Sequence, residues 1–194
     1  MSEADPLALV ADWYGEAVAA GLPEPDAMAL ATATPEGVPS VRFVLFKGID
    51  SDGVRFYTNY ESRKGRELAQ NPRAAIAIWW QALQRQVRME GPVEPLPAAE
   101  SDAYFAGRAR ASRIGAWASL QGRAIPDREW LDARVAEAEA RFGDDEVPRP
   151  PYWGGYRLIP EVVELWEGRP SRLHDRRHFL RRPDASWSEE RLSP

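Results

Sequence analysis

The hydrophobic pattern of this 194-residue chain follows two different periods. Residues 5–20 carry apolar side chains at helical spacing, with Leu7, Val10 and Trp13 on one stripe, and the pattern ends before Gly21, which predicts an amphipathic helix. Most other apolar runs are short, rich in branched and aromatic residues, and separated by turn sequences such as PEGVP and DSDG, which predicts β-strands. The predicted strands are 27–34, 41–47, 54–59, 74–80, 84–93, 152–158, 162–167, 178–182 and 187–192, and further helices are predicted at 62–70, 98–107, 112–119 and 127–142.

This order of elements favours an α+β fold. Many short strands with helices inserted between them indicate a mainly antiparallel barrel or sandwich. The first three predicted strands follow one another closely and are expected to pair as an antiparallel meander. Neither an internal repeat nor a low-complexity tract interrupts the pattern, so residues 1–194 are expected to form a single domain.

Composition narrows the classes of function. Lysine and arginine number 25 against 30 aspartates and glutamates, and the formal charge of −5 argues against nucleic acid as the main partner. The absence of cysteine excludes disulfides, thiolate catalysis and cysteine-ligated metals, and the sequence offers no cluster of metal ligands. The acidic start at residues 1–9 is unlike a secretory signal, and the longest apolar run, 74–80, is far shorter than the ~20 residues that cross a bilayer. A cytoplasmic location is the resulting expectation.

A group of cations at a predicted helix start is the clearest local anomaly. Ser62 is a good N-cap, which places Arg63, Lys64 and Arg66 in the first turn, where the helix dipole already contributes positive charge. A bound anion would explain this arrangement, since free backbone N–H groups and cationic side chains form a phosphate cradle. A solvated basic face is the alternative, and the residues alone leave both open. Lys64 and Lys47 are also the chain's only lysines.

Tyr104, Arg108 and Ser112 form a second candidate cluster. Their i, i+4, i+8 spacing puts them on one face if the helix continues through Gly107. Two hydroxyls and a guanidinium would suit a second phosphate. In isolation, an amphipathic helix with exposed arginines is the more common explanation of such spacing.

The third candidate is the string Arg172-Leu173-His174-Asp175-Arg176, which follows a glycine turn. One of the two histidines of the chain lies here between arginines, which favour a neutral imidazole near pH 7. A histidine in a charged loop is more often simply exposed, so a chemical role needs further support.

Seven ordered sequence blocks extend over nearly the whole chain: RFVLFKGID, VRFYTNYESRKGRELAQNPRAA, LQRQVRMEGPVE, YFAGRARASRIGAWASLQ, PPYWGGYRL, ELWEGRPSRLHDR and RLSP. In their order, their spacing and the unusual WGGY and RLHDR strings, these blocks resemble the pyridoxamine 5′-phosphate oxidases. The resemblance implies an FMN-binding split β-barrel with peripheral helices, assembled as a homodimer with two FMN molecules at the subunit interface.

The resemblance also implies which residues form the site. Cofactor contacts, some of them from the partner subunit, would come from Arg42, Phe43, Val44, Leu45, Phe46, Lys47, Tyr57, Thr58, Arg63, Lys64, Gln86, Gln121, Gly122, Trp166 and Arg176. Substrate contacts would come from Lys47, Tyr104, Arg108, Ser112, Arg172, Leu173 and His174. Arg172 and His174 would be the catalytic pair near the carbon to be oxidised, and Gly122 could contribute only its backbone. An early acidic site position, where aspartate is common, falls on Glu24.

The activity implied is the oxidation of pyridoxamine 5′-phosphate and pyridoxine 5′-phosphate by O2 to pyridoxal 5′-phosphate, in vitamin B6 metabolism. Hydrogen peroxide is released, together with ammonia from the amine, and no metal is required. Two alternatives stay open. One is a split-barrel FMN oxidoreductase that acts on another substrate, such as a phenazine precursor. The other is a non-catalytic carrier of flavin or pyridoxal phosphate, which would not need Arg172 and His174.

Overall fold

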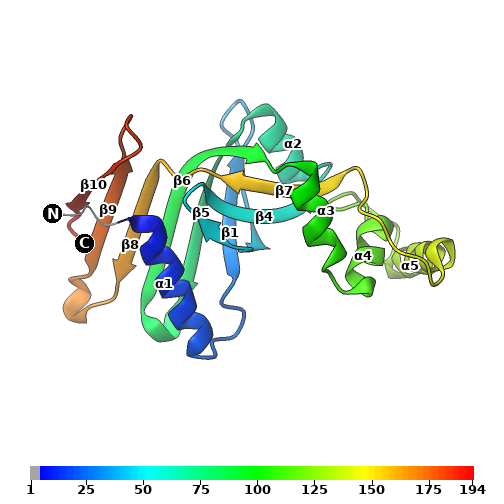
Figure 1. The fold of residues 1–194 in the computed structure, drawn as a ribbon, viewed down its shortest axis with the longest axis horizontal. Helices are drawn as coiled ribbons and strands as arrows, with labels where there is room; N and C mark the ends of the chain where they lie inside the picture. The colour runs from blue at the N-terminus through cyan, green and yellow to red at the C-terminus, as the bar shows by residue number, and fades with distance from the viewer. Residues whose placement is uncertain (1–4) are drawn as a thin grey trace.

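Ten strands form a curled, antiparallel sheet in the computed structural model, which describes residues 5–194 (Figure 1). The strands are β1 (Ala27–Ala33), β2 (Pro39–Leu45), β3 (Ile49–Asp50), β4 (Gly53–Asn59), β5 (Arg73–Trp80), β6 (Arg85–Pro95), β7 (Trp153–Leu158), β8 (Val162–Glu167), β9 (Asp175–Arg181) and β10 (Trp187–Arg191). The hydrogen-bonded order is β10-β9-β8-β6-β5-β1-β2, and β7 joins the end of β6 to β4, which pairs with β3. The long strand β6 therefore connects the two parts of the sheet. The predicted α+β class with a mainly antiparallel sheet is confirmed.

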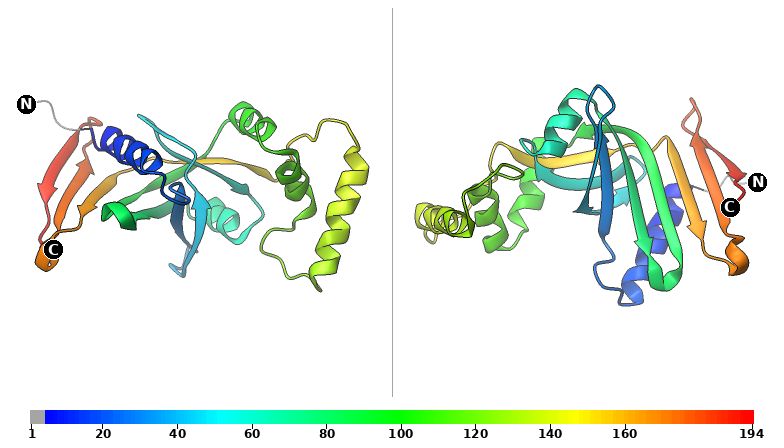
Figure 2. Two further views of the ribbon diagram at one scale, coloured as in Figure 1. Left: turned by 90° about the horizontal axis from the view of Figure 1, so that it is seen from below. Right: turned by 180° about the vertical axis from the view of Figure 1, so that it is seen from behind.

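Five helices accompany the sheet in residues 5–194: α1 (Pro6–Ala19), α2 (Arg63–Gln70), α3 (Ala98–Ala106), α4 (Arg110–Ala118) and α5 (Arg128–Phe142). Helix α1 lies across one face of the sheet and buries Leu7, Val10 and Ala17 in the main core (Figure 1). Helices α3, α4 and α5 extend from the opposite end, with α5 farthest from the sheet (Figure 2). A separate small apolar cluster that includes Ile114 and Phe142 joins α4 to α5.

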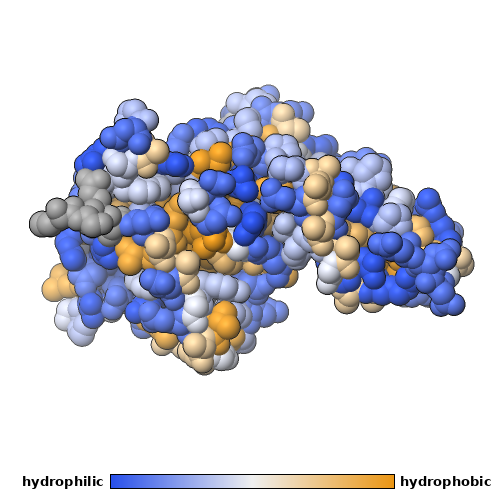
Figure 3. Space-filling view, in the orientation of Figure 1, coloured by the Kyte–Doolittle hydropathy of each residue, from blue (hydrophilic) through white to orange (hydrophobic). Residues whose placement is uncertain are grey.

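The surface reflects this division. Figure 3 shows apolar side chains gathered over the middle of the face that carries α1, whereas the α5 end is mainly hydrophilic. No helix of the described part of the chain has the length and apolar character needed to cross a membrane. The first four residues, part of the acidic start that argued against a secretory signal, lie outside the described residues.

The predicted elements are confirmed to within three residues, but the predicted meander is wrong. Strands β1 and β2 form the expected hairpin. Strand β4 does not continue it and pairs instead with β7, almost one hundred residues later, with Tyr57 opposite Gly155. Glycine is required in that part of β7, because a Cβ on Gly154 would lie 2.0 Å from the Tyr60 hydroxyl and a Cβ on Gly155 would lie 2.5 Å from Leu96. The WGGY string is therefore a packing requirement of the strand that pairs with β4.

The helix expected to run from Tyr104 through Gly107 to Ser112 is also different in the structure. Helix α3 ends at Ala106 and α4 begins at Arg110, so a break separates them. Glycine is a poor residue for a helix interior because it loses the most backbone entropy, and here it forms the C-cap of α3. The i, i+4, i+8 argument for one continuous face consequently fails.

Candidate active site

A cavity of about 240 Å³ brings together residues from the first two predicted clusters. It lies where β2, β4, the start of α2 and the start of β7 meet the α3–α4 segment. The residues that line it are Phe43, Val44, Leu45, Lys47, Tyr57, Thr58, Lys64, Tyr104, Arg108, Gln121 and Trp153. All of these except Trp153 were candidate site residues in the sequence. An aromatic residue beside two glycines is usually part of a core, which is why the sequence did not single out Trp153.

Lys64 is a buried cation in this cavity. Its Nζ donates to Thr58 Oγ1 at 3.1 Å, Gln121 Oε1 at 3.3 Å and Ser62 Oγ at 3.4 Å, and all three acceptors are neutral. Burial, with a smaller contribution from the Arg42 guanidinium, lowers the pKa of Lys64 to about 8. A buried ammonium is unfavourable unless it is paired, so this one is suited to an incoming anion. Ser62 is the predicted N-cap, and its Oγ accepts the Gly65 N–H at 3.3 Å.

The neighbouring cations already have a carboxylate partner. Glu67 is buried and accepts hydrogen bonds from Thr32 Oγ1, from Ser40 Oγ at 2.6 Å and from Arg63 Nε at 2.8 Å, and Arg42 Nη2 lies 3.4 Å away. Burial raises the pKa of Glu67, but the bonds from Ser40, Thr32 and Arg63 outweigh it and bring the pKa to about 2. Neither Arg42 nor Arg63 lines the cavity. The Glu67 carboxylate, in the middle of α2, thus pairs with both arginines, and within residues 5–194 Lys64 has no carboxylate partner.

Arg108 is the second cation of the cavity that has no acidic partner in the described part of the chain. Its guanidinium lies 4.7 Å from the centroid of the Trp153 ring, and its Nη1 is buried without a hydrogen-bond partner. Burial lowers the pKa of Arg108, against a smaller opposing effect of Tyr104. Tyr104 stacks on Tyr57 with ring centroids 3.7 Å apart and planes 5° from parallel. Ser112, which the sequence placed beside them, is exposed on α4 and does not line the cavity, because the break at Gly107 turns it away.

Lys47 lines the cavity but is already paired. Its Nζ lies 2.7 Å from Asp26 Oδ2. Glu24, the acidic position expected in the site, is exposed and lines a different depression with Trp79 and Trp80. The sequence analysis placed this acid on Glu24, whereas the acid that contacts Lys47 is Asp26, two residues later. Asp26 lies beside Lys47 because the backbone pairs at the end of β2, where Phe46 donates its N–H to the Asp26 carbonyl at 2.7 Å.

Phe46 and Gly122, two further predicted cofactor contacts, do not direct a side chain into the cavity. The Phe46 side chain is buried in the main core, 4.8 Å from the Tyr14 ring. Gly122 has a φ of +81°, which favours glycine, and a Cβ built on it would lie 3.8 Å from the backbone nitrogen of Arg63. Gly122 therefore brings the chain close to the start of α2, as a backbone contact would require.

The remaining predicted residues form a second group on β6, β8 and β9. Gln86, Trp166 and Arg176 lie opposite one another in register across these strands, so their side chains share one sheet face. Arg176 is held by two hydrogen bonds to the buried carboxylate of Glu164, at 2.8 and 3.1 Å. The His174 ring lies 4.4 Å from the Trp166 ring. None of this group lines the 240 Å³ cavity.

The loop before β9 presents the predicted catalytic pair at the surface. Arg172 and Leu173 are exposed, and Arg172 has a φ of +62°. His174 is half-buried, and its Nδ1 accepts the backbone N–H of Arg169 at 3.2 Å. Within one chain, the cavity and the Arg172–His174 loop are thus separate.

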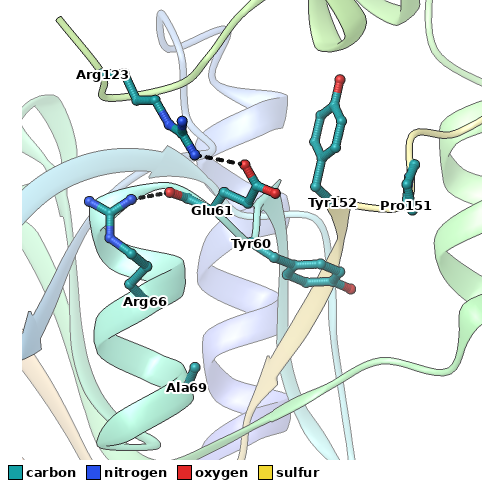
Figure 4. A pocket seen from close by; sticks show the side chains of 7 residues that line it. All are labelled: Tyr60, Glu61, Arg66, Ala69, Arg123, Pro151 and Tyr152. Atoms are coloured by element: carbon teal, nitrogen blue, oxygen red, sulfur yellow. Dashed lines mark hydrogen bonds and ion pairs between the residues drawn. The ribbon is translucent and has the colours of Figure 1, made fainter.

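A larger depression of about 500 Å³ lies beside the start of α2 (Figure 4). Its cations are already partnered, since Arg66 donates to the Glu61 carbonyl and Arg123 Nη2 lies 3.2 Å from a Glu61 carboxylate oxygen. It shares no lining residue with the 240 Å³ cavity. Size alone therefore does not identify the site, and the unpaired charge of Lys64 and Arg108 points to the smaller cavity.

Comparison with known proteins gives matches to the pyridoxamine 5′-phosphate oxidases along most of the chain. The family model described as pyridoxamine 5′-phosphate oxidase matches residues 14–142, and the model described as pyridoxine 5′-phosphate oxidase C-terminal dimerisation region matches residues 153–194. A pyridoxine/pyridoxamine 5′-phosphate oxidase of Cupriavidus taiwanensis is 56% identical over 190 residues, covering 98% of this chain and 89% of the relative. The protein of the same name from Burkholderia lata is 55% identical over 192 residues, with coverage of 98% and 89%.

Solved structures show the same architecture. PhzG from Burkholderia lata, determined in complex with tetrahydrophenazine-1-carboxylic acid, matches with a TM-score of 0.93 at 37% identity, covering 100% of this chain and 94% of that one. A pyridoxamine 5′-phosphate oxidase-related, FMN-binding protein from Nostoc punctiforme matches with a TM-score of 0.79 at 22% identity over the full length of both chains, a likeness of fold.

Proposed function

Because the chain belongs to the pyridoxamine 5′-phosphate oxidase family, whose cofactor is FMN, we propose that it oxidises pyridoxamine 5′-phosphate and pyridoxine 5′-phosphate to pyridoxal 5′-phosphate. Dioxygen is the final electron acceptor and is reduced to hydrogen peroxide, and the amine substrate also releases ammonia. The reaction belongs to vitamin B6 metabolism, and we place it in the cytoplasm. Substrate and cofactor each carry a phosphate, so the site must hold two of these anions.

Lys64 and Arg108 are the observation that carries the proposal. Lys64 is buried and Arg108 is half-buried, neither has an acidic partner in the described residues, and both line the same cavity. These residues fit FMN and a phosphorylated substrate, since charge-assisted hydrogen bonds to phosphate would satisfy Lys64 Nζ and the unpartnered Arg108 Nη1. Lys64 and Thr58 would hold the phosphate of FMN, and Arg108 with Tyr104 would hold that of the substrate.

We propose that a second copy of the chain completes the site. Val41, Phe43 and Leu45 of β2 are 70%, 77% and 48% exposed, and two of these apolar side chains line the cavity at the end of the sheet. An exposed apolar edge strand is normally covered by another element or subunit. In a homodimer closed over this strand, the loop that carries Arg172 and His174 would reach the partner's cavity, with FMN between the subunits.

FMN, when bound, accepts two electrons from the C4′ carbon of the substrate and passes them to O2. The chain's own residues have to orient the substrate and manage one proton. Tyr57 and Tyr104 provide a flat wall, and Arg108 fixes the distance between the substrate phosphate and that wall. His174 accepts a hydrogen bond at Nδ1, so its neutral ring presents the Nε2–H as a donor to the substrate.

Oxidation of a phenazine precursor is the second candidate, because PhzG shares this fold at a TM-score of 0.93. Two observations favour the phosphorylated B6 substrates over a phenazine precursor. Within Burkholderia lata, the pyridoxine/pyridoxamine 5′-phosphate oxidase is 55% identical to this chain and PhzG is 37% identical. Tetrahydrophenazine-1-carboxylic acid also carries a carboxylate and no phosphate, so it gives less reason for a dedicated phosphate site at Arg108.

One experiment tests the proposal against both alternatives. The purified protein is expected to carry a yellow flavin spectrum and, with pyridoxamine 5′-phosphate in air, to produce aldehyde and peroxide in equal amounts. Unphosphorylated pyridoxamine and a tetrahydrophenazine carboxylic acid should turn over far more slowly. Faster turnover of the phenazine precursor would replace the proposed substrate. A yellow protein that oxidises none of these compounds would favour the carrier.

A further inference from the structure

Arg169 joins the two ends of the loop that carries Arg172 and His174. Its Nε donates to Asp175 Oδ2 at 2.7 Å, and its Nη2 lies 3.2 Å from Glu167 Oε1. Glu167 is the last residue of β8 and Asp175 is the first of β9, and the two face each other in register. A single guanidinium therefore contacts both strand ends at the base of the loop.

The backbone of the same residue holds the imidazole. The Arg169 N–H donates to His174 Nδ1 at 3.2 Å, so the neutral ring carries its proton on Nε2. On its other side the His174 ring lies against Trp166 at 4.4 Å. The ring is thus fixed both in orientation and in tautomer, and the tautomer depends on where residue 169 sits.

The loop itself needs such a restraint. Ser171 and Arg172 have φ values of +59° and +62°, a region that residues other than glycine rarely occupy. Two consecutive residues of this kind persist only where the surroundings hold them. Within the loop, the backbone bond from Leu173 N to Pro170 O, at 3.2 Å, closes a single turn. The contacts of Arg169 connect this turn to the sheet, together with the Gly168 N–H, which donates to the Gln84 carbonyl at 2.8 Å.

We propose that Arg169 is a positioning residue for the oxidation. Its side chain clamps the ends of β8 and β9, and this keeps its own backbone N–H on His174 Nδ1 and the Arg172 side chain in its working position. Exposed ion pairs are individually weak, but here two of them converge on a short loop whose geometry must be set before the substrate arrives. The roles of Arg172 and His174 rest on the proposed function, whereas the clamp rests on the contacts alone.

Substitution of Arg169 tests the clamp without leaving Asp175 unpaired. Asp175 also contacts Arg191 at 3.3 Å, so its carboxylate keeps a partner when Arg169 is removed. Arg177 provides a matched control on the same strand, because its Nε and Nη2 donate to Glu189 of β10 at 2.7 and 3.0 Å, a paired contact of the same kind that does not involve the loop ends. R169A, R169K and R177A are therefore compared as flavin-loaded full-length proteins.

We expect R169A to lower kcat by about three- to tenfold, with KM and flavin content little changed, because the phosphate contacts are untouched. R169K keeps the charge but loses the fork and should lie between R169A and the unchanged protein. R177A should remain within about twofold. In R169A the amide of residue 169 should also exchange its hydrogen faster, and the ring ¹⁵N signals of His174 should move toward a mixture of tautomers. His178, bonded to Glu190, is the internal reference for the ring signals.

The proposal is overturned if R169A matches R177A in kcat, or if the His174 ring signals and the residue 169 amide are the same in both variants. A failure of the proposed function looks different. In that case the double variant R172A/H174A keeps its turnover, while the ring signals and amide exchange of R169A still report whether the clamp exists.

Discussion

Replacement of Lys64 by methionine should separate flavin binding from stability. Burial lowers the pKa of Lys64 from 10.5 to about 8, and at about 1.4 kcal/mol per pKa unit the charged side chain is disfavoured by about 3 kcal/mol in the flavin-free fold. Methionine has a similar length and no charge. Thr58 Oγ1 and Gln121 Oε1 remain bonded to each other at 3.1 Å, so K64M leaves neither of them without a partner. We therefore expect the flavin-free variant to melt at the same temperature or higher.

Flavin affinity should change in the opposite direction. A charge-assisted hydrogen bond to phosphate contributes about 1.5–3 kcal/mol, so its loss should raise the Kd for FMN by roughly 10- to 150-fold. The matched control is R66M. Arg66 lies in the same helical turn but is exposed and donates to the Glu61 carbonyl, away from the cavity. R66M should bind FMN within about twofold of the unchanged protein.

The pH dependence gives an independent check, and its sign follows from linkage. An anion favours the charged form, so it raises the pKa of Lys64 in the complex above the value of about 8 in the flavin-free protein. Affinity for FMN is then full below pH 8 and falls as the pH rises above it, by at most tenfold per pH unit. The stability of the flavin-free protein should instead rise between pH 8 and about 10.5, because the unfolded state binds more protons there.

The assay is a titration of flavin-free protein with FMN, followed by quenching of flavin fluorescence from about pH 6 to about pH 10. The unchanged protein should show the loss of affinity above pH 8, and K64M should lack it. The reasoning is refuted if K64M binds FMN as tightly as the unchanged protein. It is also refuted if the same pH dependence persists without the lysine.

Three further predictions follow from the same geometry. R108M should raise KM for pyridoxamine 5′-phosphate by roughly tenfold or more while flavin stays bound, and should reduce the preference over unphosphorylated pyridoxamine, both measurable by steady-state kinetics. R172A/H174A should lose turnover and keep the flavin absorbance, and retained activity would remove the catalytic assignment of the pair. S112A should change kcat/KM by less than about twofold, because Ser112 is exposed outside the cavity, and a large loss would show that a partner subunit or substrate reorients it.

Local patterns allowed the capped, cationic start of α2 to be predicted, since capping and charge at a helix start are properties of a few adjacent residues. The prediction for Tyr104 and Arg108 rested instead on their spacing along an assumed helix. The assumed continuous helix is wrong, but Tyr104 of α3 and Arg108, which follows the break at Gly107, both line the cavity. Hydrophobic periodicity identified the strands, but it carries no information on which strand pairs with β4, since that partner lies almost one hundred residues away.

The acid that contacts Lys47 and the contacts that hold the loop before β9 could not be predicted for a related reason. Backbone pairing at the end of β2 places Asp26, and not Glu24, in contact with Lys47. Arg169 contacts His174 because the loop turns through two residues in the left-handed region, Ser171 and Arg172, and neither of them is a glycine that would have indicated this conformation. Both contacts depend on tertiary geometry between polar residues, where the sequence shows no periodic signal.

The distribution of ion pairs argues that the charge left in the cavity serves binding. Acidic residues outnumber basic ones by 30 to 25, so the chain has enough carboxylates to pair every cation. Glu67 lies one helical turn from Lys64, yet its carboxylate contacts Arg63 and Arg42. If the fold were optimised for stability alone, a carboxylate would pair with the buried Lys64 ammonium rather than with the more exposed arginines, because the buried charge has the larger desolvation cost. The flavin-free protein is therefore expected to be less stable than it could be, and FMN should raise its melting temperature in proportion to the logarithm of the flavin concentration.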